Sequence, residues 1–408
     1  MKILIFDDSL HFLGGVGKFS AYIAQTLQNK HEITIVSIKK VKREFLEKSY
    51  KVRLNGVKLK VLKEEFFGKN KIYKKILNFI NKIGNRGSVS EIIRDITLKL
   101  ILFKGYLNAI SEYSRYFDVF INSNMTRGIY PHAKRNIMLC HFPTNFDWYT
   151  FTYYNSLYIK IYTFLLYLLN PPTGFFNKYE IFCNSKFTEK WTKKIWNLRP
   201  KGVVYPPVDF FQKKENKENI IIYVGRFDPY GIKRQHDAIR AFKKLHDSGL
   251  KGWELHLIGG TVEEAHQDAY LNYLKSIAKG YPITFHENAK FDELGEFYSK
   301  AKIYWNLRGL YFKEDEKNAW LYEHFGITNI EAMQNYCVPL VFNGGGQVEV
   351  IENGKDGFLI NNLKELINLT KELAESDLKR EEIANNAYEK SKKFSFQNFT
   401  KSILEIFE

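Results

Sequence analysis

The sequence of 408 residues contains few cysteines, no long apolar run and no internal repeat. Its three cysteines, Cys140, Cys183 and Cys337, lie far apart and offer neither a disulfide framework nor zinc-ligand spacing, so we expect a reducing compartment. No run of 18 apolar residues occurs, which argues against a membrane-spanning helix. The nearest approach, "LYIKIYTFLLYLL" at residues 157–169, is interrupted by Lys160 and predicts a buried or interfacial helix. No internal repeat of 20–50 residues is evident.

The length and the opening residues bound the class of protein. A chain of this length suits two domains of roughly 200 residues each. It is 45% hydrophobic and 26% charged, which indicates a folded globular protein rather than a disordered one. The opening "MKILIFDD" is too short and too soon acidic for a signal peptide, so it predicts a first strand.

Positive charge is concentrated in the first half of the chain. Residues 1–207 carry 34 Lys and Arg against 14 Asp and Glu, a net +20, whereas residues 208–408 carry 27 against 31, a net −4. The density is greatest between Lys39 and Lys104. Such a field attracts nucleic acid, an acidic membrane face or a phosphorylated substrate. A solvated lysine-rich surface is the plainer interpretation.

Short apolar runs alternate with helical segments and predict an α/β fold with parallel sheets. The runs are "KILIFD", "EITIVSI", "VKLKVL", "VFINSN", "NIMLCHF", "YEIFCNS", "NIIIYVGRF", "ELHLIGG", "ITFHEN", "IYWNL" and "PLVFNG". Predicted helices include Gly17–Gln28, Asp237–Asp247, Asp268–Ala278 and Asp292–Lys300. The proline pair in "VVYPPVDF" and the polar run "QKKENKEN" predict a linker. We therefore expect domains at 1–207 and 208–387, with a helix at about 388–408 that packs back on the first domain.

Three stretches at predicted strand ends could bind an anion or a sugar. In "LGGVGKFS", Gly14 and Gly15 allow close backbone approach and open a helix, although neither a P-loop nor a Rossmann fingerprint is complete. In "VGRFDPYGIKRQ", Arg226 and Lys233 suit a diphosphate. In "CHFPTNFDW", His141 ends a strand. A tight turn, two solvated charges and a structural histidine are the respective alternatives.

The stretch "YEHFGITNIEAM" places two glutamates around a predicted helix start. Gly326 predicts that the helix begins near Ile327–Thr328, with Glu323 on the preceding loop and Glu331 pointing inward from the helix. Just downstream, "FNGGGQVEV" puts three glycines at a strand–helix junction, where their N–H groups could approach a ligand or simply form a turn.

These stretches together resemble the retaining glycosyltransferases of family 4, which have the GT-B fold: two facing Rossmann-like domains with the active site in the cleft between them. The matching motifs run in family order over nearly the whole chain, except residues 39–115: "GG", "HFP", "CNSKFT", "YPPVD", "GR" with the later lysine, "EHFGITNIEAM" and "GGGQVEVIENGKDGFLI". The pattern "EHFGI…EAM" resembles mannosyltransferase-like members.

The resemblance assigns roles to residues. It implies that Glu323 contacts hydroxyl groups of the donor hexose and that Glu331 holds the ribose. It further implies that Arg226 and Lys233 bind the leaving diphosphate and that His141 contacts the sugar near the reacting carbon. The remaining donor-binding positions that it implies are Gly14, Gly15, Phe325, Gly326, Ile327 and Thr328, chiefly through backbone N–H groups.

The resemblance also implies the reaction. The chain lacks an Asp-x-Asp triplet, so we expect no metal and no cofactor besides the nucleotide sugar, with GDP-mannose favoured over UDP-glucose. The anomeric configuration would be retained without a separate protein base. Three stretches depart from the family: Lys233–Arg234 stands where "KG" is usual, "QNYCVP" (Gln334–Pro339) stands where small residues are usual, and the segment Trp305–Trp320 before Glu323 is longer than in many members.

The basic first half and the aromatic region Trp148–Tyr179 predict a lipid-linked glycan acceptor and peripheral contact with an anionic membrane, on its cytoplasmic face. A nucleic-acid-binding protein is a weaker alternative, because it leaves the two glutamates unexplained, and we expect no nucleic acid partner. A nucleotide-sugar epimerase, a phosphorylase or an inactive sugar-nucleotide binder on the same fold stays open.

Overall fold

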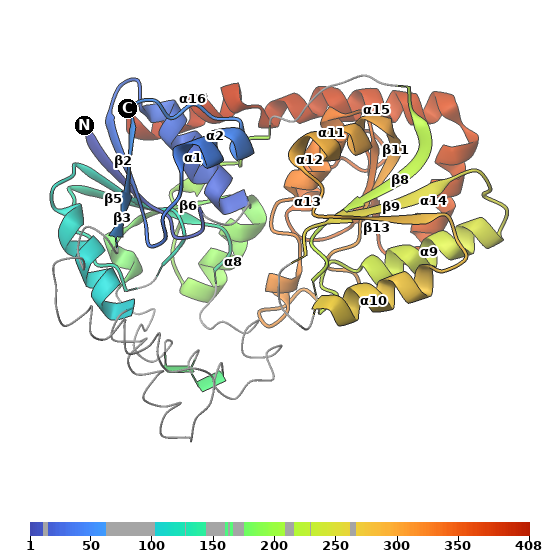
Figure 1. The fold of residues 1–408 in the computed structure, drawn as a ribbon, viewed down its shortest axis with the longest axis horizontal. Coiled ribbons are helices and arrows are strands. Elements are labelled where there is room, and N and C mark those ends of the chain that lie inside the picture. The colour runs from blue at the N-terminus through green and yellow to red at the C-terminus, as the bar shows by residue number, and fades with distance from the viewer. Residues whose placement is uncertain are drawn as a thin grey trace. The chain divides into compact units, whose positions relative to one another are not determined.

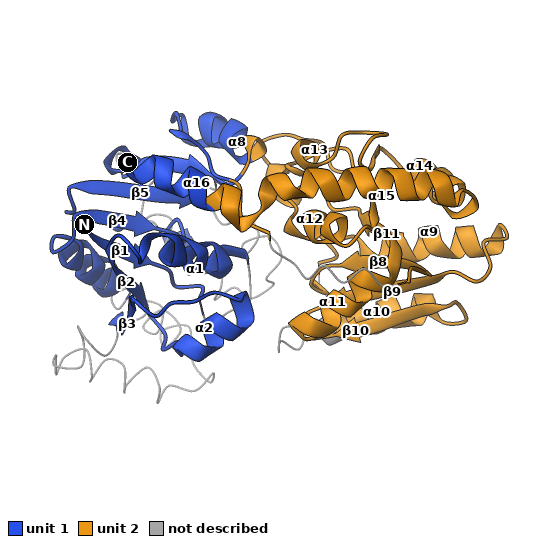
Figure 2. Ribbon diagram, turned by 90° about the horizontal axis from the view of Figure 1, so that it is seen from above, with its two compact units in different colours: residues 1–184, 188–204, 400–408 blue, residues 185–187, 205–399 orange. Residues whose placement is uncertain are grey.

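The computed structural model describes residues 1–10, 15–62, 103–126, 128–143, 160–161, 164–165, 175–208, 216–228, 230–261 and 267–408. These residues form two compact units (Figure 2). The first unit comprises residues 1–184, 188–204 and 400–408, and the second comprises residues 185–187 and 205–399.

The first unit is built on a parallel sheet whose strands follow the order β3-β2-β1-β4-β5-β6-β7 (Figure 1). Apolar, largely β-branched strand residues are buried on both faces, as parallel sheets require. The strands are β1 Lys2–Phe6, β2 Glu32–Ser37, β3 Val57–Val61, β4 Val119–Asn122, β5 Arg135–Cys140, β6 Glu180–Cys183 and β7 Gly202–Val203. The helices include α1 Gly15–Leu27, α2 Arg43–Tyr50, α8 Lys186–Trp196 and residues 103–114.

The second unit is built on a parallel sheet in the order β10-β9-β8-β11-β12-β13 (Figure 1). Its strands are β8 Glu218–Val224, β9 Glu254–Gly259, β10 Ile283–Glu287, β11 Ala301–Asn306, β12 Val338–Phe342 and β13 Phe358–Ile360. Its helices are α9 Gln235–Asp247, α10 Gln267–Ala278, α11 Phe291–Lys300, α12 Ile327–Gln334, α13 Gln347–Val350, α14 Leu363–Glu375 and α15 Asp377–Ser391. The chain ends with α16 Phe396–Phe407.

Alternate residues of β8 enter different cores, which places helices on both faces of the second sheet. Ile221 and Tyr223 pack in a core with α9, α10 and α14, whereas Ile220 and Ile222 pack in a core with α11 and α12. The second core holds the buried face of helix α12 against the sheet. This position brings its N-terminus to the carboxyl edge of the strands, where ligands bind in such folds.

The α/β fold with two Rossmann-like sheets agrees with the prediction. The four predicted helices appear within two residues of their expected starts, and α12 begins at Ile327 as expected. Strands β7 and β13 were not predicted, since both are short. The cysteines are free and buried, and no helix in the described part of the chain is long and apolar enough to cross a membrane.

The C-terminal segment differs from the expected helix at 388–408. Residues 388–399 group with the second unit, and only residues 400–408 group with the first. The reason is that Val208 N donates to Phe394 O at 2.8 Å, and the Phe394 ring packs against Tyr205 and Phe325. The same contacts move the boundary between the units from residues 207/208 to 204/205.

Candidate active site

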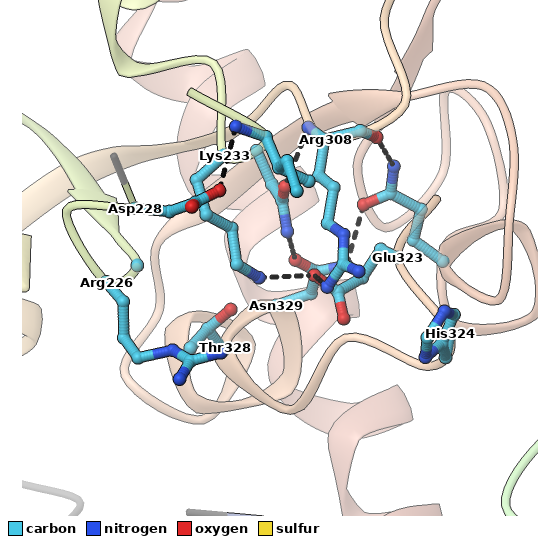
Figure 3. A network of polar contacts seen from close by, with 12 residues as sticks. Arg226, Asp228, Lys233, Arg308, Glu323, His324, Thr328 and Asn329 are labelled. Atoms are coloured by element: carbon cyan, nitrogen blue, oxygen red, sulfur yellow. Dashed lines mark hydrogen bonds and ion pairs between the residues drawn. The ribbon is translucent and has the colours of Figure 1, made fainter. Parts of the chain in front are cut away.

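Three charged side chains meet at the carboxyl edge of the second sheet (Figure 3). Lys233 comes from the loop between β8 and α9, Arg308 follows β11, and Glu323 precedes α12. Lys233 Nζ donates to Glu323 Oε2 at 2.9 Å, and Arg308 Nη1 lies 3.7 Å from the same oxygen. The three side chains are only 21%, 16% and 13% exposed, respectively, so their charges interact with little screening.

These contacts determine the charge states of the cluster. Burial raises the pKa of Glu323, but the charges of Lys233 and Arg308 outweigh burial and hold the pKa at about 2. Burial lowers the pKa of Lys233; the carboxylate of Glu323 opposes this, and the charges of Arg308 and Arg226 add to it. Burial and the charge of Arg308 lower the pKa of His324 to about 3, so its ring is neutral. Glu323 is therefore an ionised hydrogen-bond acceptor and not a proton donor.

The loop that carries Arg226 and Lys233 is held by the side chains of Asp228, within the loop, and Tyr223, on β8. Asp228 accepts hydrogen bonds from the N–H groups of Tyr230 and Ile232 at 3.2 and 3.0 Å. The hydroxyl of Tyr223 donates to the carbonyl of Lys233. Arg226 has an exposed side chain, and its charge acts on Lys233. Both cations predicted for a diphosphate thus lie on one loop, with Lys233 held by Glu323 and Arg226 exposed to solvent.

The N-terminus of α12 lies beside Glu323 because Gly326 adopts a left-handed conformation. Its φ is +102°, and a Cβ there would lie 2.5 Å from Asn329 Nδ2. The first N–H groups of a helix, here those of Ile327 and Thr328, have no partner within the helix and favour an anion. The side chain of Phe325 points away from this edge into the core. It is buried and stacks on Tyr205, with the two ring centroids 5.4 Å apart, so only the backbone of Phe325 faces the edge.

Glu331 lies inside the second unit on α12, as the sequence predicted. It is 7% exposed, and Tyr298 Oη donates to its Oε2 at 3.2 Å. Thr328, one turn earlier, accepts a hydrogen bond from Tyr304 Oη at 2.8 Å. Glu323 therefore lies on the loop that precedes α12, and Glu331 lies within the helix.

A closed chain of hydrogen bonds supports the site from below. Arg308 N donates to Asn306 Oδ1 at 3.2 Å, and Asn306 Nδ2 donates to Asn329 Oδ1 at 2.8 Å. Asn329 Nδ2 donates to Gln347 Oε1 at 3.4 Å, and Gln347 Nε2 returns to Arg308 O at 3.4 Å. All three amide side chains are buried. The circuit joins the end of β11, the first turn of α12 and the start of α13.

Two of the three glycines of "FNGGGQVEV" donate their N–H groups within the protein and so support this loop. Gly346 N donates to Glu323 O at 2.7 Å, and Gly344 N donates to Phe342 O at 2.9 Å. A Cβ on Gly346 would lie 2.0 Å from His324 O, so only glycine lets the two backbones approach this closely. Glu349, in the same stretch, accepts from Phe187 N at 2.7 Å and is structural.

The first unit holds His141 directly after β5. His141 Nε2 lies 2.8 Å from Ser123 O, and burial lowers the pKa of its ring. A carbonyl oxygen only accepts, so Nε2 carries the hydrogen and Nδ1 is an acceptor. Gly15 is the exposed first residue of α1, whereas Gly14 lies outside the described residues. The cleft between the domains stays a prediction.

Arg308 and the three amides were missed by the sequence analysis. The only signal was the length of the segment Trp305–Trp320, which contains Arg308 and Asn306. Among the described residues no three His, Cys, Asp or Glu side chains gather as a metal site would need. The absence of a metal requirement stays a prediction.

Comparison with known proteins shows which enzymes the chain is similar to. Residues 207–390 match the model of glycosyl transferases group 1. The chain is 29% identical over 252 residues to a GDP-Man:Man(3)GlcNAc(2)-PP-Dol alpha-1,2-mannosyltransferase of Xenopus laevis, covering 55% of this chain and 47% of that one. It is 24% identical over 366 residues to the alpha-1,3/1,6-mannosyltransferase ALG2 of Dictyostelium discoideum, covering 77% and 79%. The chain thus spans about half the length of the alpha-1,2-mannosyltransferases that it matches.

A solved structure shows the same fold at low identity. The structure of Anabaena Alr3699/HepE in complex with UDP and glucose superimposes with a TM-score of 0.67 at 15% identity, covering 100% of this chain and 99% of that one. The chain therefore has the GT-B fold of two Rossmann-like domains, and its residues 207–390 are similar to the glycosyl transferases of group 1.

Proposed function

We propose that the chain is a retaining hexosyltransferase that moves a hexose from a nucleotide sugar to a glycan carried by a lipid. One observation carries the proposal: Lys233, Arg308 and Glu323 form one polar cluster beside the N-terminus of α12 (Figure 3). The names of the relatives, which specify GDP-Man and a PP-Dol glycan, favour GDP-mannose as donor over UDP-glucose and a lipid-linked acceptor.

The cations suit the leaving diphosphate. Negative charge develops on the phosphate oxygen as the bond to the anomeric carbon breaks. Lys233 is already held in place by Glu323, and Arg226 adds a second positive charge at the same edge. Donors fixed before the reaction stabilise this charge without reorganisation. The first N–H groups of α12 act in the same direction.

The carboxylates suit the two sugars of the donor. Glu323, ionised and partly exposed, accepts hydrogen bonds from hexose hydroxyls, and Glu331 holds the ribose. In the first unit, His141 offers Nδ1 to a hydroxyl of the hexose, and Gly14 and Gly15 lie near the donor phosphates or the acceptor. These roles come from the family resemblance and stay proposals.

Retention needs no protein base at the reacting carbon. The acceptor oxygen bonds to the anomeric carbon on the face from which the phosphate leaves, and a phosphate oxygen takes the acceptor's proton. Lys233 and Arg226 replace a metal as counter-charge to the diphosphate, so the transfer is proposed to be metal-independent.

Release of GDP from GDP-mannose and of UDP from UDP-glucose, with and without lipid-linked glycans, tests the proposal. We expect acceptor-dependent release that a chelator does not lower, and a product with the donor's anomeric configuration by NMR. Lys233→Met should lower the rate by ~10²–10³ because it removes one preorganised donor. Lys243→Met on α9, which removes a lysine that donates to Ile277 O, is the matched control and should retain activity. Acceptor-independent isomerisation of the sugar, or no release from either donor, would contradict the proposal.

A further inference from the structure

Arg308 makes more contacts in the candidate site than its distance to Glu323 suggests. Its Nε donates to Leu321 O at 3.1 Å, and its Nη2 donates to Trp320 O at 3.1 Å. One guanidinium therefore binds two backbone carbonyls just before Glu323 as well as the carboxylate itself. The side chain fixes both the path of the loop and the direction of Glu323.

The backbone of Arg308 is held just as firmly. Its N–H and its carbonyl are the two ends of the hydrogen-bond circuit through Asn306, Asn329 and Gln347. Arg308 thus connects the end of β11 and the first turn of α12 to the loop that carries Glu323. A lysine could pair with Glu323, but a single ammonium group lacks the planar fork that serves three acceptors at once.

The segment that Arg308 opens is also attached at its far side. The hydroxyl of Tyr322 donates to Phe312 O at 2.5 Å, and the guanidinium of Arg234 lies 5.1 Å from the Tyr311 ring centroid. Two of the departures from the family pattern, Arg234 and the longer segment, therefore contact each other. These contacts hold the segment in place within the second unit. The segment can therefore help to position Glu323, which follows it.

We propose that Arg308 is a positioning residue for the donor sugar: through its contacts it holds Glu323 in the orientation that accepts hydrogen bonds from the hexose hydroxyls. This inference rests on the proposed function. Glu331, which is assigned to the ribose, lies on α12 and accepts a hydrogen bond from Tyr298 Oη, so loss of Arg308 should affect the hexose and spare the nucleotide.

The test compares binding of nucleotide sugars with binding of bare nucleotides by calorimetry on the full chain. We expect Arg308→Met to weaken the binding of GDP-mannose or UDP-glucose by ~10–100-fold, which corresponds to the loss of one or two hydrogen bonds to a charged group. The binding of GDP or UDP should weaken by less than about threefold. Arg308→Lys should recover part of the loss. In a chain that already carries Glu323→Gln, Arg308→Met should weaken the nucleotide sugar less than about twofold, because the residue acts through Glu323.

Arg380→Met is the matched control for loss of a buried arginine. Arg380 is 5% exposed, donates to Leu373 O at 2.8 Å and pairs with Asp377, all on α14 and α15. It should lower the melting temperature and leave both affinities unchanged. Equal loss of nucleotide and nucleotide sugar in Arg308→Met, or full loss in the Glu323→Gln background, would overturn the positioning role. Failure of the proposed function appears differently, as no nucleotide release by the unaltered chain.

Discussion

Glu323 and Lys233 form a pair whose strength comes from where the two residues lie. Each is mostly buried, so the attraction is little screened, and the charge of Lys233, together with that of Arg308, keeps the carboxylate ionised. Such a pair costs desolvation energy that a purely structural site would not need. The arrangement is consistent with an acceptor and a cation kept ready for a charged ligand.

The pKa of Glu323 links stability to pH. Its pKa is about 2 in the folded chain against an ordinary 4.5, so its ionised form adds stability that is complete above about pH 4.5 and is lost as pH falls toward 2. We expect the free energy of unfolding of the unaltered chain to exceed that of Glu323→Gln most at neutral pH and progressively less in acid. Urea denaturation at several pH values measures this difference. A difference that does not change with pH would show that the carboxylate is not paired.

At the residue scale, the sequence predicted which residues belong to the site better than it predicted which atoms they contact. Lys233 and Glu323 could be predicted because each lies at the end of a recognisable strand or before a recognisable helix, and parallel strands bring such ends together. Arg308 could not, since its acceptors are backbone carbonyls of a segment whose path no local pattern specifies. Glycines 344–346 were recognised as a close approach, but the sequence could not say that the approach is to Glu323 and His324.

Among the elements, α12 depends on the loop packed against it. Gly346 has a φ of −74°, which alanine adopts without strain, so the cost of Gly346→Ala is the clash of its Cβ with the backbone of His324 and Phe325. We expect a loss of about 1–3 kcal/mol of stability and weaker binding of the nucleotide sugar, because the backbone of Glu323 must shift. Thermal melting and donor affinity measure the two effects.

Gly354→Ala is the control for this substitution. Gly354 has a φ of +79° and open space around a Cβ, so alanine there should cost only about 1 kcal/mol of backbone strain and leave donor affinity unchanged. Equal effects of both substitutions on donor affinity would show that contact between the two loops does not matter.

Arg234 sits in a conformation that glycine prefers. Its φ is +61°, while its side chain contacts Tyr311 and Phe312 and pairs with Asp237. Arg234→Ala and Arg234→Gly lose the same contacts, but only glycine relieves the left-handed backbone. We expect the alanine variant to be less stable than the glycine variant by about 0.5–1 kcal/mol in chemical denaturation. The opposite order would mean that the left-handed conformation carries no cost in this loop.

Most elements of both sheets were predictable because apolar runs of strand length alternate with helical periods. The shortest strands were not, since β7 has two residues and β13 has three, and so few residues carry no periodicity. The C-terminal helix was predicted correctly as helical but with wrong bounds. Phe394, which precedes α16, packs in the core of the second unit. This tertiary contact, which no local pattern specifies, determines which C-terminal residues group with that unit.

At the scale of the whole molecule, the uneven charge is the main feature without a structural account. The net +20 of residues 1–207 predicts binding to anionic membranes, with about 1 kcal/mol from each basic residue near the surface. We expect flotation with anionic liposomes at low salt and release at high salt. No binding at either salt concentration would exclude the membrane claim and leave the transferase proposal intact.

The buried amides of Asn306, Asn329 and Gln347 all point the same way around a ring that the backbone of Arg308 closes: Asn306 donates to Asn329, Asn329 to Gln347, and Gln347 to Arg308 O. Turning one amide over would set N–H against N–H on one side and oxygen against oxygen on the other, so the ring tolerates no partial reversal. We therefore expect the three positions to change together: related chains should either keep all three amides or replace all three. We also expect the loop that carries Glu323 to adopt a single conformation.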